Sequence, residues 1–174
     1  MNLFHFVAQC QEYNIQDQYE EYGVRGFDLR VKFDKNGDTV FAHGKYVYDC
    51  TLEDITKDLA YLDKKGGCNV RVIHEARTKE EYTPENVERF KAFCSAIEAS
   101  YLNIKFWNGN NLYTAKNDYP FKNKPTCLEL YASVRAPKLI DDWIPRLYAF
   151  INNKKNIRKG TDRDILLVDF VNYR

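Results

Sequence analysis

The residues best suited to acid–base chemistry in this sequence are its three histidines, and each lies at or near the end of an expected strand. His5 falls late in the first strand, His43 follows a hairpin return, and His74 closes a later strand. In α/β barrels the carboxyl ends of the strands form the active-site face. This placement therefore predicts a site to which more than one histidine contributes.

Charged residues also interrupt strands that are otherwise apolar. Asp28 and Arg30 are two positions apart in the second expected strand, so their side chains point to the same face. Asp169 stands in the apolar last strand, where a carboxylate can orient a histidine by accepting a ring N–H. Glu75, beside His74, is a further acidic candidate.

Imidazoles, a guanidinium and carboxylates together form a coherent set for phosphodiester cleavage. The reaction needs a base to deprotonate the attacking hydroxyl and an acid to protonate the leaving oxygen. It also needs fixed positive charge on the phosphoryl oxygens, which the planar fork of an arginine supplies. The residue types indicate a phosphodiester site.

The same residues also have structural interpretations, which the sequence leaves open. Asp28 and Arg30 can form an intrastrand ion pair, because structural ion-pair networks resemble functional sites. His5, between two phenylalanines, can be a core histidine, and His74 can be structural or form a pocket wall. Asp169 can cap a segment or pair with a nearby cation.

Short apolar runs alternate with amphipathic stretches along the chain, a pattern typical of β-α units. Asn14 and Thr51 are expected N-caps, Pro84 is expected at the first position of a helix, and Asn36-Gly37 predicts a hairpin turn. The expected strands are 3–8, 26–33, 39–42, 69–74, 103–107, 126–133 and 164–171. The expected helices are 15–22, 51–62, one that begins at Thr83, and 139–152.

These elements predict a single α/β domain over residues 1–174, with a mostly parallel sheet that is curled or closed. An eight-fold barrel needs roughly 250 residues. A chain of this length is therefore expected to form a shortened or distorted TIM-type (β/α) barrel.

Composition excludes several classes of function. The chain has 26 Lys+Arg against 25 Asp+Glu, and a net charge of +1 exerts no long-range attraction on nucleic acid or acidic membranes. No stretch approaches the roughly 18 apolar residues of a membrane span, and the start is unlike a signal peptide. Five scattered cysteines without a Cys-x-x-Cys pair indicate reduced thiols and no structural zinc site. We expect a cytoplasmic protein.

A longer motif runs through the first expected helix and the hairpin. It comprises Gln11-Glu12-Tyr13-Asn14, Gln18, Tyr22-Gly23-Val24-Arg25-Gly26-Phe27-Asp28-Leu29-Arg30-Val31 and Ala42-His43-Gly44. This motif resembles the catalytic X-region of bacterial phosphatidylinositol-specific phospholipase C, which has a helix ending in Gly-(Val/Ala/Ile)-Arg, a strand Phe-Asp-(Ile/Leu)-Arg and a following His-Gly. Val168-Asp169-Phe170-Val171 is similar to the last barrel strand of that family.

The resemblance implies a distorted TIM barrel and a role for each matched residue. Arg30 matches the arginine that binds phosphate, Asp28 the acidic residue beside it, and His43 the second histidine, which is the general acid. Asp169 matches a late aspartate that orients the first histidine. The Gly-(Ser/Thr)-His loop that carries the first histidine in that family is absent here. His5 lies 28 − 5 = 23 positions before Asp28, nearer the interval in sphingomyelinase-D-like and glycerophosphodiesterase branches, and is expected to act as the base.

We therefore expect a phosphoric diester hydrolase or lyase that acts on a small phosphodiester or a phospholipid head group, with no nucleic-acid polymer as partner. The candidate substrate-binding residues are Arg30, His74, Glu75, Trp107 and Tyr131. Because the arginine two residues from Asp28 would repel a divalent cation, no metal or other cofactor is expected. The alternative is Mg²⁺ or Ca²⁺ held by Asp28 and Glu75.

Two other functions remain open. The absent first-histidine loop favours a non-catalytic binding protein, which would hold a phosphorylated small molecule through Arg30 without turning it over. The short chain also allows an interaction module that forms one half of an oligomeric barrel, which an exposed apolar sheet edge would mark.

Overall fold

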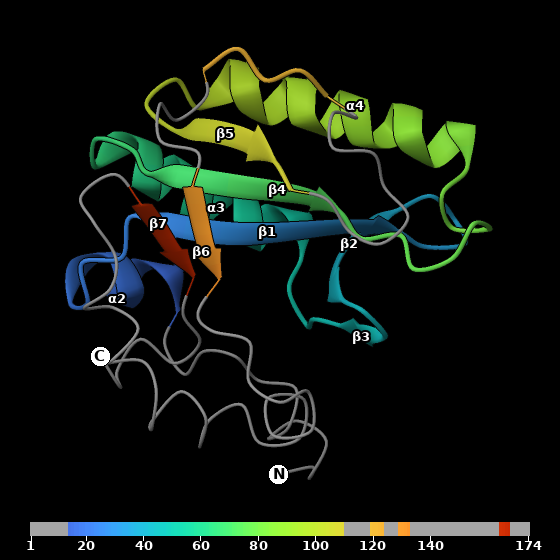
Figure 1. Ribbon diagram of the computed structural model, residues 1–174, viewed down its shortest axis with the longest axis horizontal. Helices are drawn as coiled ribbons and strands as arrows, with labels where there is room; N and C mark the ends of the chain where they lie inside the picture. Colours follow the sequence, from blue (N-terminus) through green and yellow to red (C-terminus); the bar gives the residue numbers. More distant parts are fainter. Residues whose placement is uncertain (1–13, 110–118, 124–128, 133–163, 168–174) are drawn as a thin grey trace, which may run out of the picture. The chain divides into compact units, whose positions relative to one another are not determined.

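The computed structural model describes residues 14–109, 119–123, 129–132 and 164–167 (Figure 1). The chain divides into two compact units, one formed by Arg25–Pro125 and the other by Met1–Val24 together with Thr126–Arg174. The expected first strand at 3–8 and the expected helix at 139–152 lie outside the described residues.

The unit Arg25–Pro125 contains a five-stranded mixed sheet in the order β3-β2-β1-β4-β5 (Figure 1). The α/β class is confirmed, but in the part of the chain that the structure describes the sheet is open and no closed barrel is found. Its strands are β1 (Gly26–Phe33), β2 (Thr39–His43), β3 (Tyr46–Val47), β4 (Asn69–His74) and β5 (Lys105–Asn108).

The strands run in two directions, because a tight hairpin reverses the chain after β1. β1, β4 and β5 are parallel, whereas β2 pairs antiparallel with β1 and β3 pairs antiparallel with β2. In the hairpin, Gly37 adopts a φ of 86° and donates its backbone N–H to the carbonyl of Asp34 at 3.0 Å. The predicted Asn36-Gly37 turn is confirmed, and the sheet is more mixed than the sequence predicts.

Two helices connect the parallel strands. α3 (Leu52–Lys64) precedes β4, and α4 (Pro84–Ser100) connects β4 to β5. Because β1, β4 and β5 follow one another in a single direction across the sheet, right-handed crossovers place both helices on the same face. The Tyr101 hydroxyl at the end of α4 donates to the Thr56 carbonyl of α3 at 3.1 Å, which joins the two helices.

The helices begin where the sequence predicts, because each start is capped by a side chain. Thr51 forms a capping box: its hydroxyl accepts from the Asp54 N–H at 3.1 Å, and the Asp54 carboxylate accepts from the Thr51 N–H at 2.9 Å. Thr83 caps α4, with Pro84 as its first residue. The predicted ends are less accurate, since α3 extends two residues beyond the expected 62.

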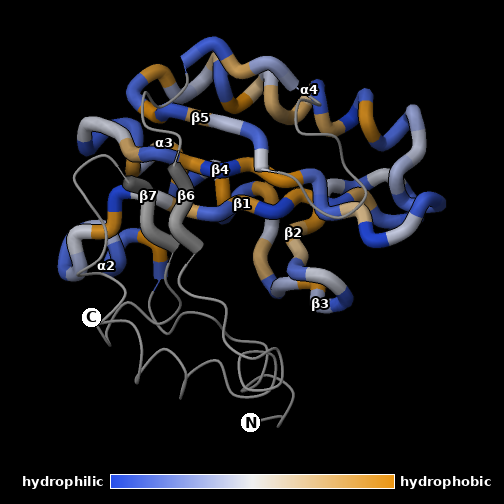
Figure 2. The backbone as a smooth tube through the Cα atoms, in the orientation of Figure 1, coloured by the Kyte–Doolittle hydropathy of each residue, from blue (hydrophilic) through white to orange (hydrophobic). Residues whose placement is uncertain are grey.

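The hydrophobic core lies between the sheet and the two helices. β1 alternates, with Leu29, Val31 and Phe33 buried and the residues between them more exposed, and the same alternation of hydrophobic and hydrophilic residues is visible in Figure 2. Phe41 of β2 packs edge-on against Phe93 of α4, with ring centroids 6.4 Å apart. The core side of the sheet is therefore the side that α4 covers.

The other unit contributes a short helix and a second sheet among its described residues. α2 (Ile15–Glu20) is capped by Asn14, whose side chain accepts from the Asp17 N–H at 2.8 Å. β6 (Glu129–Ala132) and β7 (Asp164–Leu167) pair in parallel.

A matched pair of leucines tests the assignment of the core. Leu62 of α3 is fully buried, whereas Leu102 is 74% exposed. We expect Leu62→Ala to lower the free energy of unfolding by about 2–5 kcal/mol, since it removes buried methyl groups and leaves a cavity. Leu102→Ala is expected to change it by about 0.5 kcal/mol or less. Urea unfolding measures both, and equal effects would contradict the assignment.

Candidate active site

A cluster of ions lies on the face of the sheet opposite α4. Asp28 and Arg30 occupy alternate positions of β1, out of phase with the buried core residues of that strand. In the parallel register of β1 and β4, Asp28 lies beside Arg71. Residues in register share a face, so this pairing brings a second guanidinium to the same side of the sheet.

The carboxylate of Asp28 is shared between the two arginines. Its Oδ2 accepts from Arg30 Nε at 2.8 Å, and its Oδ1 accepts from Arg71 Nε at 2.6 Å. The side chains of Asp28 and Arg30 are each 25% exposed and that of Arg71 is 15% exposed. Each carboxylate oxygen thus holds one guanidinium, in an environment where charge-assisted hydrogen bonds are stronger than in water.

Glu75 connects this cluster to the turn that follows β2. Its side chain is only 4% exposed, and its Oε2 lies 3.4 Å from Arg30 Nη1. Its Oε1 accepts the backbone N–H of Gly44 at 2.8 Å. A buried carboxylate requires such partners, and these two contacts join β1 to the turn that carries His43.

The backbone conformation favours glycine at position 44. Its φ is 68°, in the left-handed region that side chains disfavour. A Cβ there would also lie 2.6 Å from Nη1 of Arg77, but this atom is the end of a flexible side chain that can move aside. The His-Gly pair of the sequence motif therefore has a physical explanation, since the glycine makes the tight turn that follows His43.

The electrostatic environment favours an ionised Asp28 and a neutral His43. Burial raises the pKa of Asp28, but the hydrogen bond and charge of Arg71, followed by those of Arg30, outweigh it and hold the pKa below its ordinary value of 3.8. His43 is an exposed residue at the end of β2. Partial desolvation of its ring and then the Arg30 guanidinium lower its pKa below 6.5, against the opposing effects of Glu75 and Asp28. The imidazole is therefore mainly neutral at pH 7.

The structure thus brings three of the predicted residues, Asp28, Arg30 and Glu75, into contact. His43 lies at the end of β2, where the charges of these three residues influence its pKa. Trp107 of β5 is 6% exposed and in register with Arg71, so it lies on the same face of the sheet. His5 and Asp169 lie outside the described residues, as does the side chain of Tyr131, which belongs to β6.

His74 lies elsewhere, although the sequence predicts it as a substrate-binding residue. It is 2% exposed and shares the core face of Val31, its partner in the β1–β4 register. Its ring stacks on Phe90 of α4 at 5.0 Å and also contacts Phe33 and Tyr82. Because successive strand residues point to opposite faces, Glu75 reaches the ion cluster and His74 does not. Its placement favours the structural interpretation.

Arg71 belongs to this site although the sequence did not predict it. A signal was present, because an arginine stands there between the buried apolar residues Val70 and Val72. Its significance depends on the β1–β4 register, which places it beside Asp28. The sequence pattern of one strand does not show how that strand is aligned with its neighbour.

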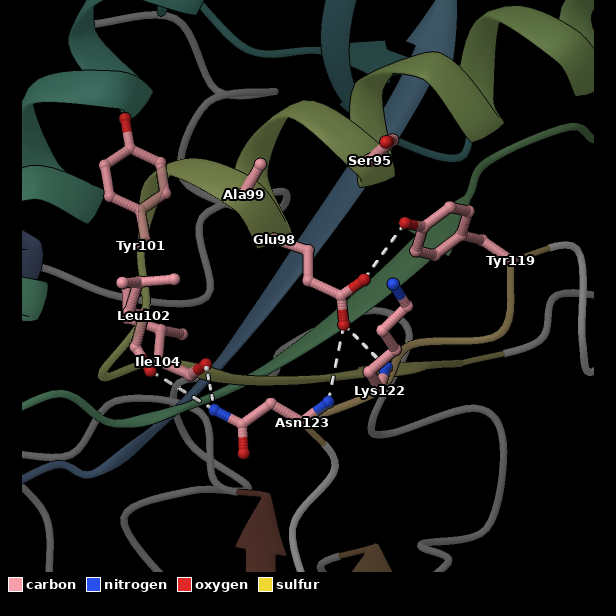
Figure 3. A pocket seen from close by; sticks show the side chains of 9 residues that line it. All are labelled: Ser95, Glu98, Ala99, Tyr101, Leu102, Ile104, Tyr119, Lys122 and Asn123. Atoms are coloured by element: carbon pink, nitrogen blue, oxygen red, sulfur yellow. Dashed lines mark hydrogen bonds between the residues drawn. The ribbon is translucent and has the colours of Figure 1, made fainter.

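A pocket of about 320 Å³ lies at a different place, beside the C-terminal end of α4 (Figure 3). Glu98 occupies one side of it and accepts from the Tyr119 hydroxyl at 3.0 Å and from the backbone N–H of Lys122 at 2.6 Å. Asn123 donates to the carbonyl of Leu102 at 3.3 Å. These contacts attach residues 119–123 to α4. The pocket includes Ile104, which directly precedes β5.

The two carboxylates that the sequence offered for Mg²⁺ or Ca²⁺, Asp28 and Glu75, both contact the Arg30 guanidinium. Over the described ranges, no three His, Cys, Asp or Glu residues gather as metal ligands, and Cys50 and the two other cysteines there form no disulfide. No helix in this portion is long and apolar enough to traverse a bilayer.

No protein-family model matches the sequence, and no curated protein matches it either. The resemblance to the phospholipase C X-region therefore depends on the quoted motif, of which Asp28, Arg30 and His43 belong to the site described above.

The contribution of Asp28 to stability, and its dependence on pH, can be measured with the variant Asp28→Asn. We expect this variant to be less stable than the wild type at pH 7 by about 1–3 kcal/mol, because it removes a carboxylate that is bonded to two cations. The pKa of Asp28 is lowered on folding. Its contribution is therefore present above the unfolded pKa and is lost as the pH falls through the folded one. The difference in the free energy of unfolding between wild type and variant should thus vanish at low pH. Urea unfolding across pH 2–7 measures it, and a constant difference would contradict this expectation.

Proposed function

We propose that this protein cleaves a phosphodiester by general acid–base catalysis, with Arg30 binding the phosphate. The observation that supports the proposal is a guanidinium held between Asp28 of β1 and Glu75, which follows β4, and close enough to His43 to influence its pKa. We further propose that the scaffold is a shortened barrel. The parallel succession β1-α3-β4-α4-β5 supports it, since consecutive β/α units of this kind build such barrels.

Arg30 supplies fixed positive charge for the phosphoryl oxygens. Asp28 holds its Nε and Glu75 lies near its Nη1, so two of its three nitrogens are oriented by the protein. Preorganised donors of this kind stabilise developing negative charge without having to reorganise during the reaction. In this proposal the remaining N–H groups of the fork bind a phosphate oxygen.

His43 is the proposed general acid. In the free protein its lowered pKa favours the neutral ring. A phosphodiester bound at Arg30 would add a negative charge nearby and raise that pKa, so that ligand binding and protonation of the ring support each other. The imidazolium then gives its proton to the leaving alkoxide as the P–O bond breaks. His5 remains the predicted base for the attacking hydroxyl, and Asp169 the residue predicted to orient it.

A second candidate is a non-catalytic protein that binds a phosphorylated small molecule. The neutral state of His43 at pH 7 favours it, because a neutral imidazole cannot donate the proton that a leaving alkoxide requires. Such a protein would use Arg30 in the same way, but it would form no product during long incubation.

Replacement of His43 distinguishes the two functions. If His43 is the acid, His43→Ala should lower kcat for a glycerophosphodiester or a phosphoinositide head-group diester by about 10²–10⁴-fold. His74→Phe is the matched control, since it replaces the core histidine by an aromatic residue and should leave turnover close to that of the wild type. Unchanged turnover in His43→Ala would contradict the catalytic role, and no turnover in the wild type would favour the binding protein.

The protonation of His43 is a separate test. We expect its ring to titrate below pH 6.5 in the free protein, because burial and Arg30 both lower the pKa. Arg30→Gln should move the midpoint upwards by removing the cation, and inorganic phosphate should do so in the wild type by adding an anion. Proton NMR of the imidazole C–H signals gives these midpoints. A free midpoint above 6.5 would show that the assigned environment is wrong.

A further inference from the structure

We propose that Arg71 is a second phosphate-binding residue, so that two guanidinium groups, one from β1 and one from β4, hold the unesterified oxygens of a phosphodiester. This inference depends on the proposed function and extends it. It is carried by three features of Arg71, namely its ion pair, its burial and its contact with Gly109.

The first feature is that Arg71 shares its carboxylate with another cation. Over the described residues, the one ion pair of Arg71 is with Asp28, which Arg30 also uses. Only its Nε takes part in that hydrogen bond, so the bond to Asp28 uses neither terminal nitrogen. A guanidinium carries five N–H donors in a fixed fork that matches phosphate geometry.

The second feature is the position of Arg71 in the sheet. The residue lies between the buried Val70 and Val72 and its side chain is only 15% exposed, so its charge is largely removed from water. Asp28 already has a partner in Arg30. Asp28 and Glu75 balance the charges of the two arginines overall, but two guanidinium groups beside one carboxylate repel each other, and burial adds a desolvation cost. An anion bound to both groups would lessen their repulsion.

The third feature is that the backbone fixes the stem of Arg71. A Cβ at Gly109 would lie 2.9 Å from both Cγ and Cδ of Arg71 and 2.6 Å from Cγ1 of Ile73. The bare backbone of Gly109 therefore lies directly against the arginine stem, and its N–H donates to the Val72 carbonyl at 2.8 Å. With the stem packed and Nε bonded, the fork loses little further freedom when a ligand binds.

The experiment measures the binding of inorganic phosphate by isothermal titration calorimetry, with turnover of the diesters above as a second readout. Arg71→Gln should weaken phosphate binding at least tenfold and raise KM similarly. Arg71→Lys, which keeps the charge and loses the fork, should have a smaller effect. Arg89→Gln is the matched control, because Arg89 pairs with Glu85 on the surface of α4, away from the site, and its replacement should leave both readouts unchanged.

The outcomes separate this inference from the proposed function. If Arg30→Gln weakens phosphate binding while both Arg71 variants keep wild-type affinity, the role of Arg71 is overturned and that of Arg30 stands. A lower melting temperature with unchanged affinity would likewise show that Arg71 is only structural. If the wild type neither binds phosphate nor cleaves a diester, the proposed function itself fails. Arg71→Lys preserves the ion pair with Asp28 and decides the question if Arg71→Gln does not fold.

Discussion

The parallel register between β1 and β4 is the constraint on which the site depends. It places Asp28 beside Arg71, so that one carboxylate holds the guanidinium groups of two strands. The apolar residues of the opposite face fix this register, because Val31 and Val72 are fully buried there. A slip of one residue would move Arg71 into the core and expose Val72. The hydrophobic core thus positions the charges from the opposite face of the sheet.

Glu75 extends this arrangement beyond the parallel strands. Its buried carboxylate needs partners, and it obtains them from Arg30 and from the backbone of Gly44. The second contact connects the antiparallel hairpin to β4. The antiparallel strand β2 therefore matters to the site. It ends at His43, and the Arg30 guanidinium lowers the pKa of this residue.

The electrostatics of the cluster link ligand binding to protonation. Asp28 and Glu75 compensate Arg30 and Arg71 in the free protein, while burial and Arg30 keep His43 mainly neutral. An anion at the two arginines would change that balance and favour the charged imidazole. The pocket at the end of α4 has no comparable set, since its one carboxylate, Glu98, bonds to residues 119–123 and so fixes a loop.

The sequence by itself determined the local features of this protein. Capping residues, the Asn-Gly turn and strand alternation depend on neighbours in the chain, so the helix starts, the hairpin and the shared face of Asp28 and Arg30 followed from them. Tertiary structure decided which strands became neighbours. It placed Arg71 in the site and His74 in the core, and it left the described sheet open. Register and partner strands arise from packing between distant segments, and no periodicity within one segment encodes them.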